Sequence, residues 1–218
     1  MLLPKVKICC ISSPQEAQTA IRAGASALGL VAEMPSGPGV ISDDTIRAIA
    51  RSVPPPIATF LLTSRTDTAL IAAHQQATGA NTVQIVDALT SGSYAELRAA
   101  LPGIALVQVI HVVDEASLDE ALAIAPRVDA LLLDSGNPKL AVKELGGTGR
   151  VHNWAISRQI VEQADVPVFL AGGLRPDNVR AAVDAVQPWG LDLCSGVRTE
   201  GRLDEQKLTA FFEALARV

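Results

Sequence analysis

The sequence predicts an α/β fold: a single closed (β/α)8 barrel of near-minimal size that occupies residues 1–218 as one domain. Short apolar or β-branched runs alternate with helical patterns along the whole chain, which is typical of parallel βα units. Eight such units fit into 218 residues, and this length is close to the lower size limit of a (β/α)8 barrel. No shift in composition marks a linker. The alternation also permits an open, doubly wound sheet, which remains the alternative architecture.

The predicted elements follow one another in strict βα order. The strand candidates are Lys5–Cys9, Ala27–Val31, Ile57–Leu62, Thr82–Ile85, Ala105–Ile110, Ala130–Asp134, Pro167–Ala171 and Leu191–Cys194. The helix candidates are Pro14–Ala23, Asp43–Arg51, Asp67–Ala77, Ser93–Ala100, Glu115–Ile124, Asn153–Gln163, Asp177–Val186 and Asp204–Ala216. The first helix has the clearest start, because Ser13 stands at the N-cap and Pro14 at the first helical position. Gly24 and Gly79 are placed to end two helices.

Composition excludes several classes of protein. With 49% hydrophobic and 19% charged residues, the chain is too apolar to be disordered. A net charge of −5 and the absence of basic runs argue against a nucleic-acid partner. No apolar run approaches the roughly 20 residues that cross a bilayer. The three cysteines, two of them adjacent, predict no disulfide framework and a reducing, cytoplasmic location.

The first strand carries the first candidate for chemistry. Period-2 alternation directs Lys7 and Cys9 into the barrel, and Val6, Ile8 and Cys10 toward the helices. Cys9 then lies at the barrel mouth, where a partly polar setting lowers a thiol pKa and makes it a base or nucleophile. The alternative is a buried cysteine that acts as a small hydrophobic residue.

Two carboxylates end other strands. Asp134 closes an apolar strand and is a candidate general acid or base; the alternative is that it caps the turn at Ser135. Asp192 points inward from the eighth strand, so it is expected to pair with Lys7 on the neighbouring first strand. His111 ends the fifth strand and is expected to line the mouth, whereas His74 is expected on the surface. The histidines lack metal-ligand spacing, and we expect neither metal nor cofactor.

Glycine clusters follow the last three strands. They are Gly146-Gly147-Thr148-Gly149, Gly172-Gly173 and, after Cys194, Ser195-Gly196. Glycines let backbone N–H groups approach an anion closely, and the loops after the seventh and eighth strands are where many barrels bind phosphate. The sequence therefore predicts a phosphorylated small-molecule ligand.

These blocks resemble the phosphoribosylanthranilate isomerase family of tryptophan biosynthesis nearly end to end. KICCIS at 7–12, GASALGLV at 24–31, LLLD at 131–134, GGTGRVHNW at 146–154, LAGGLRPDNV at 170–179 and DLCSGV at 192–197 match the family's motifs in order. The resemblance implies an Amadori rearrangement by an aldose–ketose isomerase without a cofactor. Asp134 is then the general acid and Cys9, as a thiolate, the general base. Gly172, Gly173, Ser195 and Gly196 cradle the phosphate, flanked by Gly147, Thr148 and Gly149. Family members occur as monomers and as homodimers.

The chain departs from the family pattern at the aromatic end of the substrate. Gly39 stands where an arginine holds the anthranilate carboxylate, and Val86 stands where the fourth strand carries a histidine. Cys10 replaces the glycine after the catalytic cysteine, and Asn153 replaces an aspartate. Arg198 and Arg150 are candidates for the missing cation, and Lys7, Gln84, His111 and Arg198 are candidates to line the substrate site. Two alternatives stay open: an isomerase of another phosphosugar, and a non-catalytic barrel that binds a phosphosugar.

Overall fold

The computed structural model describes residues 3–136 and 152–216. Within them, eight parallel strands pair in chain order and the last closes on the first. The strands are β1 (Lys5–Ile8), β2 (Ala27–Val31), β3 (Ala58–Thr63), β4 (Thr82–Ile85), β5 (Ala105–His111), β6 (Ala130–Asp134), β7 (Val168–Leu170) and β8 (Gly190–Leu193). The helices are α1 (Pro14–Ala23), α2 (Asp43–Ser52), α3 (Thr68–Thr78), α4 (Tyr94–Ala100), α5 (Ala116–Ile124), α6 (Trp154–Gln163), α7 (Val179–Val186) and α8 (Glu205–Leu215). The predicted (β/α)8 barrel is confirmed, and the open sheet is excluded.

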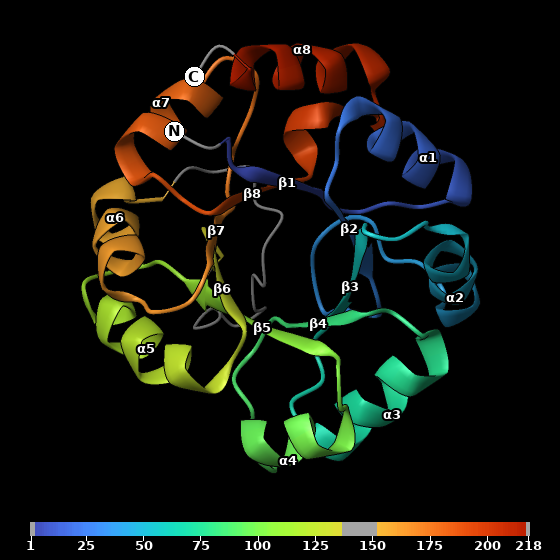
Figure 1. Ribbon diagram of the computed structural model, residues 1–218, viewed down its shortest axis with the longest axis vertical. Coiled ribbons are helices and arrows are strands. Elements are labelled where there is room, and N and C mark those ends of the chain that lie inside the picture. Colours follow the sequence, from blue (N-terminus) through green and yellow to red (C-terminus); the bar gives the residue numbers. More distant parts are fainter. Residues whose placement is uncertain (1–2, 137–151, 217–218) are drawn as a thin grey trace.

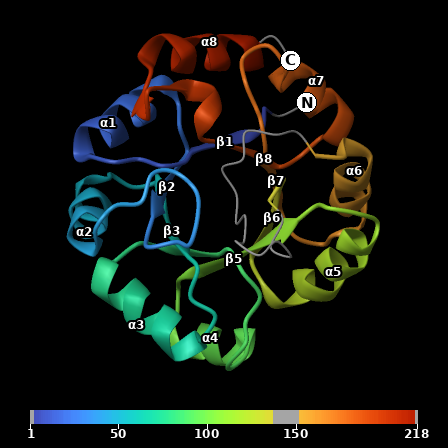
Figure 2. The ribbon, with the colours of Figure 1, turned by 180° about the vertical axis from the view of Figure 1, so that it is seen from behind.

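The helices form an outer ring around the strands (Figure 1). Figure 2 shows the other end of the barrel, toward which the strands run with their carboxyl ends. In barrels of this type the active site lies at that end. Smaller elements were not predicted: the 3-10 turns η1 (Ala125–Arg127) and η2 (Ser195–Val197), and a short ribbon made by β9 (Arg198–Thr199) and β10 (Arg202–Leu203).

The alternation of the first strand is confirmed through Cys9. Val6 and Ile8 are buried in the layer between strands and helices, where they pack with α1, α7 and α8 residues such as Ala17 and Phe211. Cys9 instead belongs to the cluster inside the barrel. Because the inward positions of a parallel barrel converge on one axis, this register places Lys7 and Cys9 in the interior.

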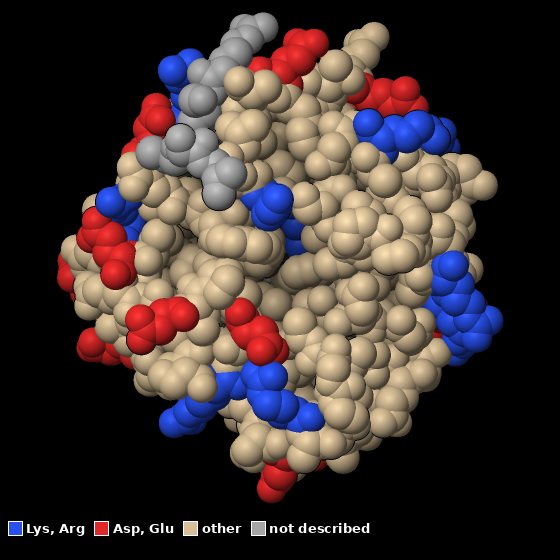
Figure 3. Space-filling view, viewed as in Figure 1, with Lys and Arg blue, Asp and Glu red and all other residues tan. Residues whose placement is uncertain are grey.

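The amino-terminal end of the barrel interior is lined largely by small side chains. Ala27, Ala58, Ala105 and Ala130 each stand at the start of a strand, where bulky residues usually fill a barrel. They border a hollow of about 510 Å³, which opens near the middle of the face shown in Figure 3. Trp189 lies at this end and its ring contacts Phe169 edge-on, with 5.1 Å between ring centroids. The charged and sulfur-bearing side chains of the interior lie farther along the strands.

The helix termini follow the predicted signals. Ser13 accepts a hydrogen bond from the Glu16 amide at 3.1 Å, and Gly24 ends α1 in the left-handed conformation with φ of 117°. Gly79 ends α3 in the same way. The seventh helix begins two residues later than predicted, at Val179. The Asn178 side chain instead braces the preceding loop, accepting from the Arg175 amide at 2.8 Å.

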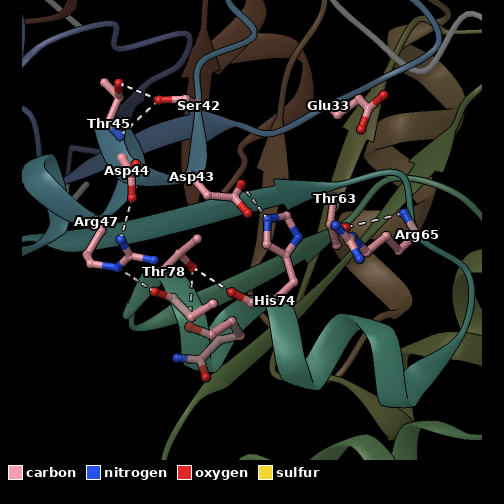
Figure 4. A network of polar contacts seen from close by, with 12 residues as sticks. Glu33, Ser42, Asp43, Asp44, Thr45, Arg47, Thr63, Arg65, His74 and Thr78 are labelled. Atoms are coloured by element: carbon pink, nitrogen blue, oxygen red, sulfur yellow. Dashed lines mark hydrogen bonds and ion pairs between the residues drawn. The ribbon is translucent and has the colours of Figure 1, made fainter.

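The prediction that His74 lies on the surface is wrong. This side chain projects from α3 toward α2, and its Nε2 lies 3.0 Å from Oδ1 of Asp43 (Figure 4). The histidine is buried, so the contact is an interhelical one. Arg47 adds a second link between the same helices, because its Nε donates to the Ala77 carbonyl at 2.7 Å. A helical pattern shows which residues share a face of the helix, but not whether a neighbouring helix covers that face. This explains the error.

Candidate active site

A cavity at the carboxyl end of the barrel collects most of the predicted site residues. Those that line it are Cys9, Gln84, Asp134, Gly172, Gly173, Ser195 and Gly196. They come from strands β4 and β6, from the residue that follows β1 and from the loops after β7 and β8. Residues 36–38 of the loop after β2 complete the wall. Because Cys9 and Asp134 face a shared cavity with both glycine loops, the arrangement fits acid–base chemistry on a small anionic substrate.

The Cys9 thiol is buried, with 6% of its surface exposed. Burial raises the pKa of Cys9 from an ordinary 9.0 to about 11, although the neighbouring Lys7 cation opposes the shift. The expectation of a lowered pKa and a resident thiolate is therefore wrong for the unliganded protein. The physical reason is that loss of water around the sulfur outweighs the stabilisation offered by one nearby cation.

The predicted Lys7–Asp192 pair is present. Lys7 Nζ lies 2.8 Å from Asp192 Oδ1, and the lysine is fully buried. Burial disfavours the charge on Lys7, but the Asp192 carboxylate and Cys9 outweigh it and raise the lysine pKa. The ammonium group also lies 5.3 Å from the centre of the Phe60 ring. Lys7 is not among the residues that line the cavity, so it supports Cys9 from within the barrel.

Gly29 makes room for this arrangement, and sequence reasoning missed its role. A Cβ at this position of β2 would lie 2.7 Å from the Cys9 sulfur and 3.0 Å from Lys7 Nζ. No real side chain tolerates such a contact. A single glycine inside a strand is the available signal, since it indicates close approach of another group.

Asp134 makes the expected capping contact and also faces the cavity. Its Oδ1 accepts a hydrogen bond from the Ser135 amide at 2.7 Å, which is the capping contact. The same residue lines the cavity and is 8% exposed. Capping therefore orients the carboxyl group without removing it from the site.

The glycine loops after β7 and β8 are pressed together. A Cβ on Gly196 would lie 1.9 Å from the Leu174 carbonyl oxygen, so no side chain fits at that position. Gly172 and Gly173 both have positive φ, at 85° and 62°. Asn178, which was not predicted as a site residue, donates to the Gly173 carbonyl at 2.9 Å and fixes this loop. The two loops thus form a continuous backbone wall on one side of the cavity.

Gln84 contributes an acceptor that lacks a protein donor. It is 3% exposed and lines the cavity from β4. Within the described part of the chain, its buried Oε1 receives no hydrogen bond. An unsatisfied buried acceptor is costly, so a donor supplied by a ligand would stabilise it.

Arg198 does not line the cavity, and its expected role as a substrate-binding cation is corrected. Its Nη2 donates to Glu16 Oε2 at 3.1 Å, to the Cys9 carbonyl at 3.2 Å and to the Cys10 carbonyl. Nη1 donates to Gly201 O at 2.9 Å. These contacts hold the end of β1 against the segment after β8, so Arg198 is a positioning residue.

His111 is likewise absent from the cavity lining. Its Nε2 lies 2.9 Å from the Val86 carbonyl oxygen, and the ring is buried between β4 and β5. Gly147, Thr148, Gly149 and Arg150 lie outside the described residues. Among the described residues, no group of three or more His, Cys, Asp or Glu side chains could hold a metal ion. That part of the chain also contains no helix long and apolar enough to cross a membrane.

The expectation of no disulfide is contradicted. Cys10 and Cys194 form a disulfide, with their Cα atoms 6.0 Å apart, and both line the cavity. Cys10 therefore does not face the helices. Its φ of 63° is left-handed, so the strand alternation that sets the direction of Cys9 no longer applies one residue later.

Comparison with known proteins agrees with the fold. A sequence model described as N-(5'phosphoribosyl)anthranilate (PRA) isomerase matches residues 6–214. The chain belongs to this family. N-(5'-phosphoribosyl)anthranilate isomerase 2 from Methanosarcina mazei is 36% identical to this chain over 213 residues, which cover 95% of this chain and 92% of that protein. The Haloferax volcanii isomerase is 33% identical, with 99% and 94% of the two chains covered.

Solved PRA isomerases share the architecture. The crystal structure from Thermotoga maritima superposes with a TM-score of 0.81 and 26% identity, covering 99% of this chain and 100% of that one. A PRA isomerase in complex with reduced 1-(o-carboxyphenylamino)-1-deoxyribulose 5-phosphate gives a TM-score of 0.78 at 24% identity, with the same coverage. Family membership and the cavity that Cys9 and Asp134 both line are the basis on which a reaction is proposed.

Proposed function

We propose that this chain converts N-(5-phosphoribosyl)anthranilate into 1-(2-carboxyphenylamino)-1-deoxyribulose 5-phosphate. The observation that carries the proposal is the shared cavity, in which Cys9, Asp134 and the glycine loops after β7 and β8 face one another. The relatives bear the name of this reaction. A resident metal or cofactor forms no part of the proposed steps.

Asp134 is the proposed general acid. Its proton passes to the furanose ring oxygen while the C1–O bond breaks, and the anthranilate nitrogen lone pair forms the C1=N bond of a Schiff base. The contact between Asp134 Oδ1 and the Ser135 amide fixes the direction in which the carboxyl group faces. Proton transfer requires such an orientation toward the reacting oxygen.

Cys9 is the proposed general base. Its thiolate removes the proton from C2, and the C2–H electron pair forms the C1=C2 bond while the C1=N electrons return to nitrogen. The resulting enolamine becomes the ketone by gaining a proton at C1 and losing one from the C2 hydroxyl. With a pKa of about 11, the thiolate is the minor form near neutral pH. Lys7 stabilises this form, whereas its ion-pair partner Asp192 opposes it and also lines the cavity.

The glycine loops are the proposed phosphate site. Gly172 and Gly173 together with Ser195 and Gly196 offer closely spaced backbone groups on one wall of the cavity. Gly147, Thr148 and Gly149 are proposed to flank the phosphate. The free Oε1 of Gln84 is proposed to accept a hydrogen bond from a hydroxyl or amine of the substrate.

A second candidate is a related isomerase that acts on another phosphosugar. It is favoured by Gly39, since this position lacks the arginine that the resemblance places on the anthranilate carboxylate. A non-catalytic phosphosugar-binding barrel has less support, because Cys9 and Asp134 line the same cavity as the glycine loops. We also propose a cytoplasmic location, as for other biosynthetic enzymes, with either a monomeric or a homodimeric state. A dimeric form is reported for the Thermotoga maritima protein.

The test supplies phosphoribosylanthranilate and follows the loss of its fluorescence. We expect turnover by the wild type, none by Asp134→Asn, and strongly reduced turnover by Cys9→Ser. Glu213→Gln on α8 is a matched control, because it removes a carboxylate outside the cavity lining. Wild-type protein that binds the substrate but does not turn it over would favour a related isomerase or a binding protein.

A further inference from the structure

Three departures from the family pattern meet at one point of the active site. By the resemblance, Cys10 stands where the family has a glycine and Gly39 where it has an arginine, and Cys194, in the DLCSGV block at 192–197, stands where the family has a serine. These positions lie after β1, β2 and β8, which are far apart along the chain. Two of them are linked covalently, since Cys10 and Cys194 form a disulfide that spans 184 residues of sequence.

The third departure packs directly on the cross-link. A Cβ at Gly39 would lie 2.5 Å from the Cys10 Cβ and 2.9 Å from its sulfur. Gly39 also has a φ of 82°, which favours glycine. The neighbouring Pro38 carbonyl lies 3.7 Å from the Cys10 sulfur. The side chain at position 10 therefore occupies the space that a side chain at position 39 would need.

The cross-link ties the end of β1, on which the loop after β2 packs, to the proposed phosphate loop after β8. Gly37 and Pro38 form the wall after β2, where the resemblance places the aromatic carboxylate. Cys194 directly precedes Ser195 and Gly196 in the proposed phosphate loop. The spacing between these two loops thus depends on whether Cys10 and Cys194 are bonded.

We propose that the Cys10–Cys194 pair is a redox-sensitive positioning device that sets substrate affinity. With the disulfide closed, the phosphate loop is tied to Cys10, against which the loop after β2 packs. With the disulfide reduced, the substrate must order both loops when it binds. The inference rests on the proposed function for its kinetic readout. In a reducing cell such a pair would be transient, as disulfides of cytosolic proteins usually are.

Oxidation requires a small-molecule disulfide as co-reactant. The Cys194 thiolate, on the more exposed residue of the pair, attacks one sulfur of R–S–S–R; a mixed disulfide forms and one thiol RSH leaves. The Cys10 thiolate then attacks the Cys194 sulfur and a second RSH leaves. Two cysteine thiols are thereby oxidised while one R–S–S–R is reduced to two RSH. A dithiol reverses the exchange.

Cys9 keeps its place in both states. Its amide donates to the Leu193 carbonyl at 2.7 Å, and its own carbonyl accepts from Arg198 at 3.2 Å. Neither contact involves a sulfur atom. The redox state therefore acts on binding, so KM changes while kcat does not.

The test compares wild type and Cys194→Ser after treatment with a small-molecule disulfide or with a dithiol. Alkylation of the unfolded proteins followed by mass measurement counts the thiols. We expect one thiol in oxidised wild type, at Cys9, and three after reduction. We expect KM for phosphoribosylanthranilate to rise about tenfold on reduction, the effect of having to order two loops, while kcat stays within about twofold.

Cys194→Ser separates this effect from oxidation of Cys9, which the variant retains. Its KM is expected to match that of reduced wild type under both treatments, and Cys10→Gly is expected to behave in the same way. Three thiols in disulfide-treated wild type, an unchanged KM, or a redox response that persists in Cys194→Ser would each overturn the proposal. If neither state turns over, the proposed function fails. Calorimetric binding of reduced 1-(o-carboxyphenylamino)-1-deoxyribulose 5-phosphate in the two states then still decides on the device: a weaker affinity after reduction supports it, and equal affinities overturn it.

Discussion

Lys7 Nζ lies 2.8 Å from Asp192 Oδ1 inside the barrel, and the lysine is adjacent to the catalytic candidate Cys9. The two charges come from β1 and β8, the strands whose pairing closes the barrel. This ion pair therefore links the two strands that close the barrel and also sets the electrostatic environment of Cys9.

Lys7→Met is expected to destabilise the fold by about 3–5 kcal/mol, because it leaves the Asp192 carboxylate buried without its cation. Unfolding in urea measures this change. The double variant Lys7→Met/Asp192→Leu is the control and is expected to recover most of the stability, since it buries no lone charge. The single variant should also raise the pKa of Cys9 further, because Lys7 is the neighbour that lowers it most. Wild-type stability in Lys7→Met would refute the account.

The reactivity of the Cys9 thiol is expected to depend steeply on pH. Since burial holds the pKa of Cys9 near 11, the thiolate fraction grows about tenfold with each pH unit below that value. Because the pKa of Cys9 is raised, the thiolate fraction is small at neutral pH and increases as the pH rises. We expect the rate at which iodoacetamide alkylates Cys9, the free thiol beside the Cys10–Cys194 disulfide, to increase from pH 7 to pH 10 with a slope near one. Cys9→Ser should lack this reaction, and a plateau of the alkylation rate below pH 8 in the wild type would contradict the role of burial.

Gly29→Ala is expected to disable the site from the neighbouring strand. The added methyl group would lie 2.7 Å from the Cys9 sulfur and must displace it. A misplacement of this size costs on the order of 100-fold in kcat/KM, and overpacking costs about 1–3 kcal/mol of stability. Ala27→Val is the matched control, because it enlarges a residue of the same strand beside the hollow at the other end. Equal losses in the two variants would show that crowding in β2 matters rather than contact with Cys9.

The order of the strands and helices follows from the sequence, and so do the positions of Cys9 and Asp134. Period-2 alternation and strand ends placed Cys9 and Asp134 correctly, because both depend on local geometry. Cys10 was assigned to the wrong face, since a left-handed φ at one residue breaks the alternation without a sequence signal. The sequence also fails to show that Arg198 is engaged in the fold, because its partner Glu16 lies 182 residues away and only the closed barrel brings the two together.

A contact between residues distant in the sequence also explains why Gly39→Arg, which restores the arginine that the resemblance places here, is expected to destabilise the protein. Gly39→Arg places a Cβ 2.5 Å from the Cys10 Cβ and forces a side chain into a left-handed φ. We expect a loss of about 2–4 kcal/mol, from backbone strain and overpacking together. Adding Cys10→Gly removes the contacts with the Cys10 Cβ and sulfur but leaves the 3.0 Å contact with the Cα of residue 10 and the backbone strain, so the double variant should recover part of the loss.

A double-mutant cycle tests this coupling. Urea unfolding of the wild type, both single variants and the double variant, all under reducing conditions, excludes any effect of the cross-link. The expected coupling between positions 10 and 39 is about 1–2 kcal/mol, typical of residues in direct contact. If the introduced arginine then holds the anthranilate carboxylate, KM for phosphoribosylanthranilate falls in the double variant relative to Cys10→Gly alone. Additive changes in the free energy of unfolding would show that contact with Cys10 is not the reason why position 39 requires glycine. An unchanged KM would show that another group already binds the carboxylate, or that the substrate has none.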